Sequence, residues 1–264
     1  MGRERATDMT KGPVLGQMTR FALPVLFGML CQRIYNFADT YIVGRFLGDG
    51  ALAAVSISGT ATYMLFSVMM GVTTGVSVVI SQYYGAQKEG EIRRTFVAGV
   101  YVAVGMTFLI TVGGILTAGP LLRLLQTSDG LFKMAEAYLL VIYAGSAATM
   151  LYNFSAAVLR ALGNSVVPLA FLIVSSVLNV FLDVVFVAWI PMGTAGAAFA
   201  TVLAQMISGA LCLWYAFKML PFLKAEKGEW KADLYLAGQV LRYGIPTGLQ
   251  MSIISVSDMT LQAV

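Results

Sequence analysis

Residues 166–190 read VVPLAFLIVSSVLNVFLDVVFVAWI, an apolar stretch that exceeds the roughly 20 residues a membrane-spanning helix needs. Within it, Asn179 and Asp183 stand four residues apart and therefore on one face of a helix. A carboxylate at the centre of a membrane helix costs roughly 2.5–3.5 kcal/mol, so it normally faces a partner or a wet cavity. A second carboxylate, Asp39, lies in the first apolar stretch. Carboxylates in two separate spans favour a transport protein.

The composition extends the membrane interpretation to the whole chain. Hydrophobic residues make up 58% of the 264 residues and charged residues 11%, whereas a soluble domain carries about 25% charged residues. We therefore predict an all-α, polytopic membrane helix bundle. The chain has no histidine, which excludes histidine-based nucleophilic sites, zinc sites and proton relays. Cys31 and Cys212 lie in apolar stretches and are interpreted as small buried hydrophobic residues.

Two further classes are disfavoured by what the chain lacks. The net charge of +4 is divided among short loops, so no nucleic-acid partner is expected. No nucleophile–base pair or metal cluster is visible, so we expect neither an enzyme nor a cofactor.

The amino-terminal residues are polar and basic and lead into a full-length span, which predicts that no signal peptide is present.

Polar breaks and breaks with Gly or Pro divide the chain into apolar stretches of spanning length. These stretches cover residues 19–43, 52–83, 95–118, 134–160, 166–190 and 194–220, and a seventh begins near 236 and continues to 264. The predicted organisation is an amino-terminal lead (1–18), a six-span lobe (19–220), a linker (221–235) and the first span of a second lobe (236–264).

Lysine and arginine are distributed unequally between the two sides of these spans. One side carries thirteen, and the other carries only Arg45, Arg123 and Lys133. The thirteen are Arg3, Arg5, Lys11, Arg20, Lys88, Arg93, Arg94, Arg160, Lys218, Lys224, Lys227, Lys231 and Arg242. The positive-inside rule predicts a cytoplasmic amino terminus in the plasma membrane of a bacterium. At about 1.5 Å per residue, Asp39, Asp183 and Thr201 then lie at one level in the outer half of the membrane.

A short repeat links the two ends of the chain. GQMTRFALP (16–24) recurs as GQVLRYGIP (238–246), with Gly, Gln, Arg and Pro identical. The match is either a chance similarity of two helix entries or the start of a parallel repeat, a device found in transporters. A parallel repeat predicts a missing carboxy-terminal lobe, with about five more spans after the seventh.

Polar side chains form a stripe on each of two spans. Gln32, Asn36 and Asp39 share one face of the first span, and Asn179 and Asp183 share one face of the fifth. Their oxygens suit a hard cation such as Na⁺, and a buried carboxylate can alternatively take a proton. The competing interpretation is that polar side chains join helices by hydrogen bonds. That explanation suits the serines of these spans and Gln32 better than the costly carboxylates.

Two other features of the spans have a structural explanation. Arg33 lies near the middle of the first span, where it either points to a neighbouring span, snorkels toward the membrane surface or pairs with an aspartate. Gly71 and Gly75 form a Gly-x-x-x-Gly pattern, which indicates close helix packing rather than a hinge.

At these residues the chain resembles the multidrug and toxic compound extrusion family. The segments that carry the resemblance are QRIYNFADTYIVGRFLGDGALAAVS (32–56), SQYYGAQKEGEIRR (81–94), AAVLRALGNS (156–165), LNVFLDVVF (178–186) and GTAGAAFATVLAQ (193–205). The resemblance implies a twelve-span, cation-coupled exporter with two six-span lobes around a central cleft. This chain departs from that pattern in lacking spans eight to twelve and in carrying Arg33.

The resemblance also implies roles for individual residues. Those that match the amino-lobe cation or proton site, where Na⁺ is one candidate ion, are Asp39, Asn179, Asp183 and Thr201. Candidate residues of the substrate cavity are Gln32, Asn36 and Asn153.

Three functions remain open from the sequence. The first is H⁺- or Na⁺-coupled antiport that exports amphipathic, often cationic, organic compounds, with small organic substrates and the lipid bilayer as partners. The second is flipping of a lipid-linked saccharide, which calls for a cationic cavity and has Arg33 as its one supporting residue. The third is a non-transporting membrane scaffold, in which both aspartates are dispensable.

Overall fold

The computed structural model describes residues 14–224, 229–231 and 233–262, so Arg3, Arg5, Lys11 and Lys227 lie outside the described residues. Helix is the regular structure of the described residues, which confirms the all-α class. The elements in chain order are α1 (Val14–Leu47), α2 (Asp49–Gly85), α3 (Glu89–Leu124), α4 (Asp129–Ala144), α5 (Ser146–Ala161), α6 (Val166–Asp183), the π-helical turn η1 (Val184–Trp189), α7 (Thr194–Met219), the 3-10 turn η2 (Pro221–Leu223) and α8 (Leu234–Gln262).

Five of the described helical segments are long and apolar enough to cross a membrane, and the bent pair α4–α5 makes a sixth. They correspond to the six predicted spans. The helix α8 has 29 residues but does not reach the same hydropathy. Its small and polar residues lower the hydropathy, and several of them, including Gly244, Gly248 and Ser252, pack against α2.

The helices are longer than the apolar stretches predicted. Helix α1 continues to Leu47 and is separated from α2 by Gly48 alone, whose φ of +85° is a left-handed conformation that suits glycine. Helix α3 continues through Pro120. The 37 residues of α2 extend about 55 Å, well beyond a hydrocarbon core of about 30 Å.

The predicted fourth span is broken in the middle. Helices α4 and α5 meet at Gly145 with a bend of 50°. A side chain at Gly145 would overlap Val202 of α7. On the other side of the break, Thr111 and Ser146 share a hydrogen bond of 2.6 Å. Packing against α3 and α7 therefore supports a bend that hydropathy alone does not reveal.

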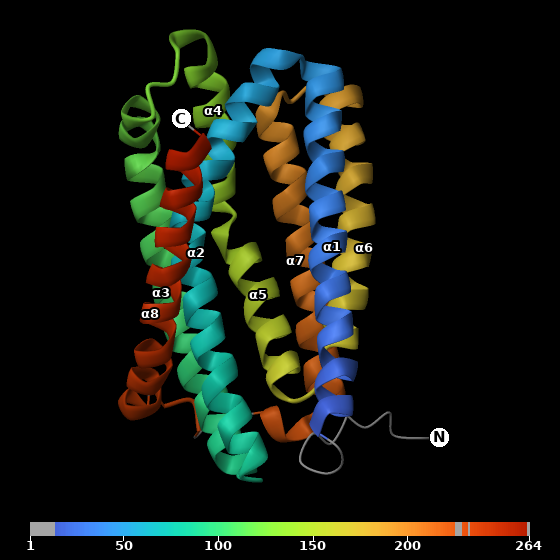
Figure 1. The fold of residues 1–264 in the computed structure, drawn as a ribbon, viewed down its shortest axis with the longest axis vertical. Coiled ribbons are helices and arrows are strands. Elements are labelled where there is room, and N and C mark those ends of the chain that lie inside the picture. Colours follow the sequence, from blue (N-terminus) through green and yellow to red (C-terminus); the bar gives the residue numbers. More distant parts are fainter. Residues whose placement is uncertain (1–13, 225–228, 232, 263–264) are drawn as a thin grey trace.

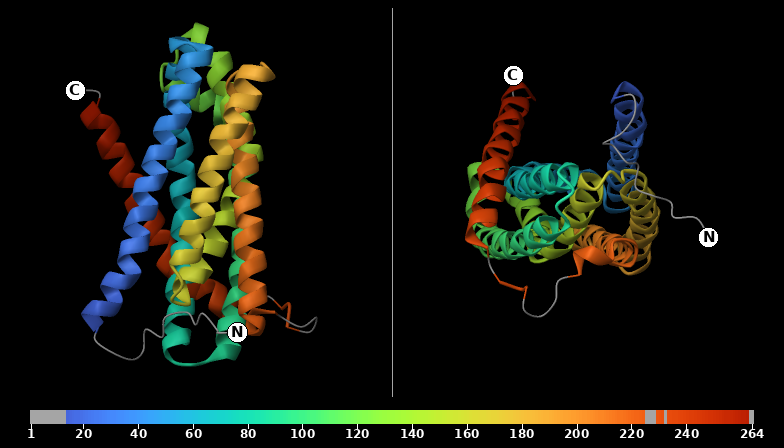
Figure 2. Two further views of the ribbon diagram at one scale, coloured as in Figure 1. Left: turned by 90° about the vertical axis from the view of Figure 1, so that its right-hand side faces the viewer. Right: turned by 90° about the horizontal axis from the view of Figure 1, so that it is seen from below.

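The helices form two groups with α4 and α5 between them. Figure 1 shows α2, α3 and α8 on one side and α1, α6 and α7 on the other. The view along the bundle in Figure 2 shows the same division. The largest buried cluster joins α2, α3, α5 and α7, with Phe96 and Phe154 in contact at 5.5 Å between ring centroids. The bundle therefore has its main core beside α5.

Helices α2 and α8 approach closely through glycines on both sides. A Cβ at Gly71 would overlap the carbonyl oxygen of Gly244 and lie 2.6 Å from the Cα of Gly248. A Cβ at Gly75 would lie 2.9 Å from the backbone nitrogen of Gly244. Farther along, the hydroxyls of Ser67 and Ser252 are 2.5 Å apart. The predicted packing role of the Gly71–Gly75 pattern is confirmed, and its partner is the matching pair on α8.

Candidate functional site

The candidate site begins at the last residue of α6. Asp183 is fully buried and Asn179, one turn earlier, is 1% exposed. The helix then changes to the wider π-helical turn Val184–Trp189. Such turns are rare and occur frequently at functional sites. The fifth span therefore places its carboxylate where the regular α-helix ends.

Asn179 uses one end of its amide to contact Asp183 on its own helix and the other end to contact Thr201 of α7. In the orientation that satisfies both ends, the nitrogen donates to Asp183 Oδ2 at 2.9 Å. The oxygen accepts from the backbone N–H of Thr201 at 3.1 Å and lies 3.3 Å from its hydroxyl. The side-chain contacts of Asn179 thus hold one carboxyl oxygen of Asp183 in place.

Asp39 of α1 completes the cluster from the opposite side. It is 9% exposed, and its carboxyl lies within hydrogen-bonding reach of Asp183. The Oδ1 atoms of both aspartates are buried and meet no donor among the described residues. Two carboxyl oxygens in this position are satisfied when a proton or a cation lies between them. The structure thus brings Asp39, Asp183 and Thr201 near one another from α1, α6 and α7.

Two tyrosines complete the surroundings of the aspartates, and the sequence reasoning missed both. Tyr35 on α1 lies near Thr201 and Asp39. Tyr138 on α4 is 9% exposed and interacts electrostatically with both aspartates. Tyr35 stands four residues before Asp39, so a search of that helix face could have found it. Tyr138 carried no such signal, because only the fold brings α4 to the site.

The candidate cavity residues lie apart from this cluster. Gln32 and Asn36 are exposed on α1, two turns and one turn before Asp39, respectively. Asn153 is half-buried on α5 and donates to the backbone oxygen of Thr149 at 2.9 Å. The structure therefore does not bring these three amides together with the carboxyls.

Arg33 is exposed on α1 and belongs to neither ion pair of the described residues. The suggested pairing with an aspartate is thus not formed. Cys31 and Cys212 are both free thiols; Cys212 is buried as expected, whereas Cys31 is only half-buried. The serine Ser208 on α7 donates to the backbone oxygen of Phe171 on α6 at 2.6 Å, the helix-joining role expected of small polar residues.

The chemistry available to the site is that of oxygen ligands. Among the described residues, no group of three or more His, Cys, Asp or Glu side chains could hold a metal ion. The two carboxyls instead suit a proton or a hard monovalent cation, with the Asn179 oxygen facing Thr201. The apolar side chains around the site include Val43, Ile142 and Val187, which keep the local dielectric low.

Several known proteins are similar to this chain in sequence. The MatE family model matches residues 24–185. The Probable multidrug resistance protein YpnP of Bacillus subtilis is 33% identical over 262 residues, which are 98% of this chain and 58% of that protein. The Probable multidrug resistance protein YoeA of Bacillus subtilis is 29% identical, over 96% of this chain and 56% of its own. The chain therefore spans little more than half the length of these relatives.

Solved structures show the same fold. A MOP superfamily transporter from Pyrococcus furiosus, described as having a binding pocket of reversed polarity, superposes with a TM-score of 0.91 and 22% identity. The match covers 100% of this chain and 58% of that one. An outward-facing multidrug resistance MATE family transporter also superposes with a TM-score of 0.91 and 22% identity, over 100% of this chain and 58% of its own.

Proposed function

The chain belongs to the MatE family, and from that premise we propose that it takes part in exporting amphipathic, often cationic, organic compounds in exchange for H⁺ or Na⁺. The relatives named above are multidrug resistance proteins, which supports small organic molecules as substrates. The family consists of transporters, so the chemistry proposed for this chain is binding and release, with no bond made or broken.

One observation carries the proposal. Asp39 and Asp183 face each other in a buried setting, each with an Oδ1 atom that meets no donor among the described residues. Packing alone gives no reason for two such groups, because isosteric apolar residues would avoid the cost of burying them. An exchangeable cation supplies that reason, since it is bound by the pair in one state and released in another.

The four residues of the proposed coupling site have separate roles. Asp183 and Asp39 bind the proton or Na⁺ between them. Asn179 orients Asp183 through its 2.9 Å hydrogen bond and anchors to α7 at Thr201. Thr201 contributes a hydroxyl oxygen near the amide. We place the substrate cavity at the polar side chains of α1 and α5 outside this cluster, where Gln32, Asn36 and Asn153 offer hydrogen-bonding groups.

The proposed placement in the membrane follows from charge. The end of the bundle where α1, α3 and α8 begin, hereafter the basic end, holds most of the described lysines and arginines, including Lys88 and Arg93. We assign this end to the cytoplasm of a bacterial cell by the positive-inside rule. Residues 19–220 then form the first lobe, 221–235 the linker, and 236 onward the beginning of a second lobe.

The test is transport by the complete native gene product in sealed liposomes. An amphipathic cationic dye is loaded inside, and its efflux is measured under an imposed proton gradient, an imposed Na⁺ gradient, or neither. Efflux that depends on one of the gradients is the expected result. Efflux that ignores both gradients rejects coupling, and translocation of a lipid-linked saccharide instead of the dye supports the flippase alternative.

A further inference from the structure

A long apolar groove lies between α3, α5 and α7, away from the aspartates. Its volume is about 630 Å³, and the residues that line it include Phe96, Val100, Thr107, Met150, Phe154 and Phe217. Along α3 the lining extends from Phe96 to Thr111, about 22 Å at 1.5 Å per residue. Half of a hydrocarbon core measures about 15 Å, so the groove is long enough for an acyl chain of one leaflet.

Trp230, from the segment between α7 and α8, lies at the basic end of the groove. Trp230 lines the groove, and its backbone oxygen accepts a hydrogen bond from Tyr101 of α3 at 3.2 Å. The neighbours of Trp230 in the chain, Glu229 and Lys231, line a second cavity of about 640 Å³. Phe96 in the groove likewise lies one helical turn from Arg93 in that second cavity. The apolar groove therefore lies next to a charged cavity at its basic end.

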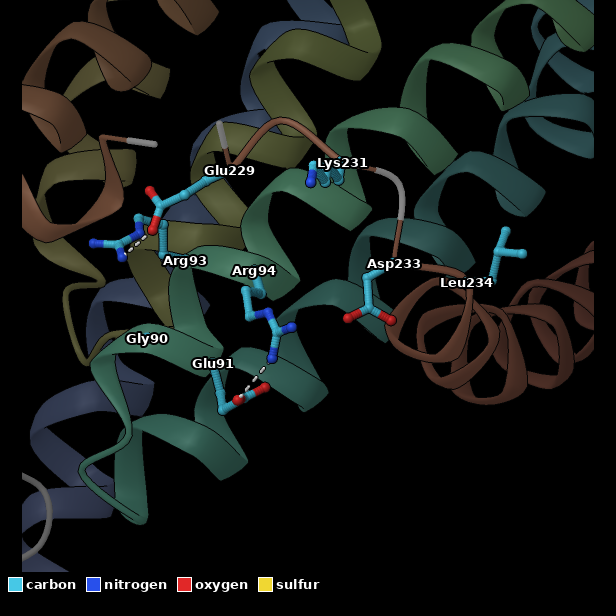
Figure 3. A pocket seen from close by; sticks show the side chains of 8 residues that line it. All are labelled: Gly90, Glu91, Arg93, Arg94, Glu229, Lys231, Asp233 and Leu234. Carbon is cyan, nitrogen blue, oxygen red and sulfur yellow. Dashed lines mark hydrogen bonds and ion pairs between the residues drawn. The ribbon is translucent and has the colours of Figure 1, made fainter. Parts of the chain in front are cut away.

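The charged cavity combines both signs of charge. Its titratable side chains are Arg93, Arg94 and Lys231 together with Glu91, Glu229 and Asp233. Figure 3 shows Arg93 paired with Glu229 and Arg94 paired with Glu91. The carboxylate of Asp233 accepts from the backbone N–H of Tyr235 at 3.1 Å and so caps α8. Three cations and three carboxylates leave this cavity without a net charge.

We propose that the two cavities together bind one zwitterionic phospholipid, with an acyl chain in the groove and the headgroup in the charged cavity. The phosphate is bound by Arg94 and Lys231, and a primary ammonium donates to the carboxylates. Balanced charge argues against a net-anionic headgroup, and the carboxylates are acceptors that favour an ammonium with N–H donors. The occupant that fits is phosphatidylethanolamine. This inference does not depend on the transport proposal.

The test compares lipid binding by groove and headgroup variants of the complete native protein. Native mass spectrometry in detergent measures adducts with phosphatidylethanolamine, phosphatidylglycerol and phosphatidylcholine. Ala147→Trp fills the inner end of the groove at an exposed lining position of α5. Leu109→Trp is its control, because Leu109 is 63% exposed on α3 and does not line the groove. Only Ala147→Trp is expected to lose the phosphatidylethanolamine adduct.

The headgroup contact is tested separately. Lys231→Glu reverses one charge of the cavity, whereas Lys224→Glu reverses an exposed lysine that does not line it. Loss of one charged hydrogen bond is expected to weaken phosphatidylethanolamine binding about tenfold in Lys231→Glu only. Ala147→Leu provides a milder filling variant if the tryptophan prevents folding. Equal binding of the three lipids, or adducts unchanged by both Ala147 variants, would overturn the proposal.

Discussion

Asp39 and Asp183 lie on different helices, α1 and α6, and their carboxyls are within hydrogen-bonding reach of each other inside the bundle. The Oδ1 atom of each is buried and meets no donor in the described part of the chain. Neighbouring carboxyls that cannot both ionise behave as a pair, with shared titration or a shared cation. This pair is the centre of the proposed coupling site.

The first prediction concerns the charge of Asp183. Asp183→Asn keeps the size and hydrogen-bonding capacity of the side chain but removes the charge that attracts the cation. In the complete protein we expect gradient-driven dye efflux to fall to the background of empty liposomes, with unchanged expression. Asp129→Asn, at an exposed aspartate of α4, is the control and should transport at the parental rate. Parental, gradient-dependent efflux in Asp183→Asn would make this aspartate structural.

The second prediction concerns the amide that orients Asp183. Asn179→Ala removes the 2.9 Å hydrogen bond to the carboxyl and the contact with the Thr201 backbone. We expect the cation concentration for half-maximal efflux to rise about tenfold, the cost of one lost hydrogen bond to a charged group. The maximal rate should suffer less than in Asp183→Asn, because both carboxyls remain. An effect as complete as that of Asp183→Asn would contradict a purely orienting role.

The third prediction concerns Tyr35. Tyr35 lies near Thr201, and Tyr35→Phe removes its hydroxyl but keeps the ring. We expect a smaller shift in the cation dependence of efflux than Asn179→Ala produces. Tyr41→Phe is a control on the same helix, because Tyr41 is 64% exposed. Identical cation dependence in both tyrosine variants would remove Tyr35 from the site.

The fourth prediction concerns the contact between α2 and α8. Gly75→Val would press a side chain against the backbone of Val240 and Gly244. Overpacking of this kind typically costs about 1–3 kcal/mol, so the melting temperature of the detergent-purified protein should fall. Gly59→Val on the same helix has nothing within 4 Å and is expected to melt like the parent. Equal melting of the two variants would show that the close approach adds no stability.

The fifth prediction concerns orientation. After Cys31 and Cys212 are replaced by serine, Lys88→Cys should resist a membrane-impermeant maleimide added outside intact cells. Arg45→Cys, at the opposite end of α1, should react readily under the same conditions. The positive-inside rule is the reason, because Lys88 belongs to the basic end. Ready labelling of Lys88→Cys from outside would reverse the proposed orientation.

Hydropathy and the cost of burying charge determined much of the architecture from the sequence. Six apolar stretches correspond to the six spans, because a membrane helix must be continuously apolar over its length. The same cost identified Asp39 and Asp183 as candidate functional residues, because an ionisable group in a membrane span is costly unless it faces a partner or a wet cavity. Residue counting along the helices also placed Thr201 at the level of the carboxyls, where it lies.

Tertiary packing decided the features that depend on contacts between distant segments. The fourth span breaks at Gly145, where Val202 of α7 leaves no room for a side chain. Local hydropathy cannot predict that contact. Tyr138 reaches the aspartates only because α4 packs beside them. Apolar composition predicts that helices pack together. Which helices pack against each other depends on side-chain shape, as the close approach of α2 and α8 at their glycines illustrates. The sequence alone thus determined the spans and the charged residues whose burial is costly. The tertiary structure decided which spans pack together and which of these residues come into contact.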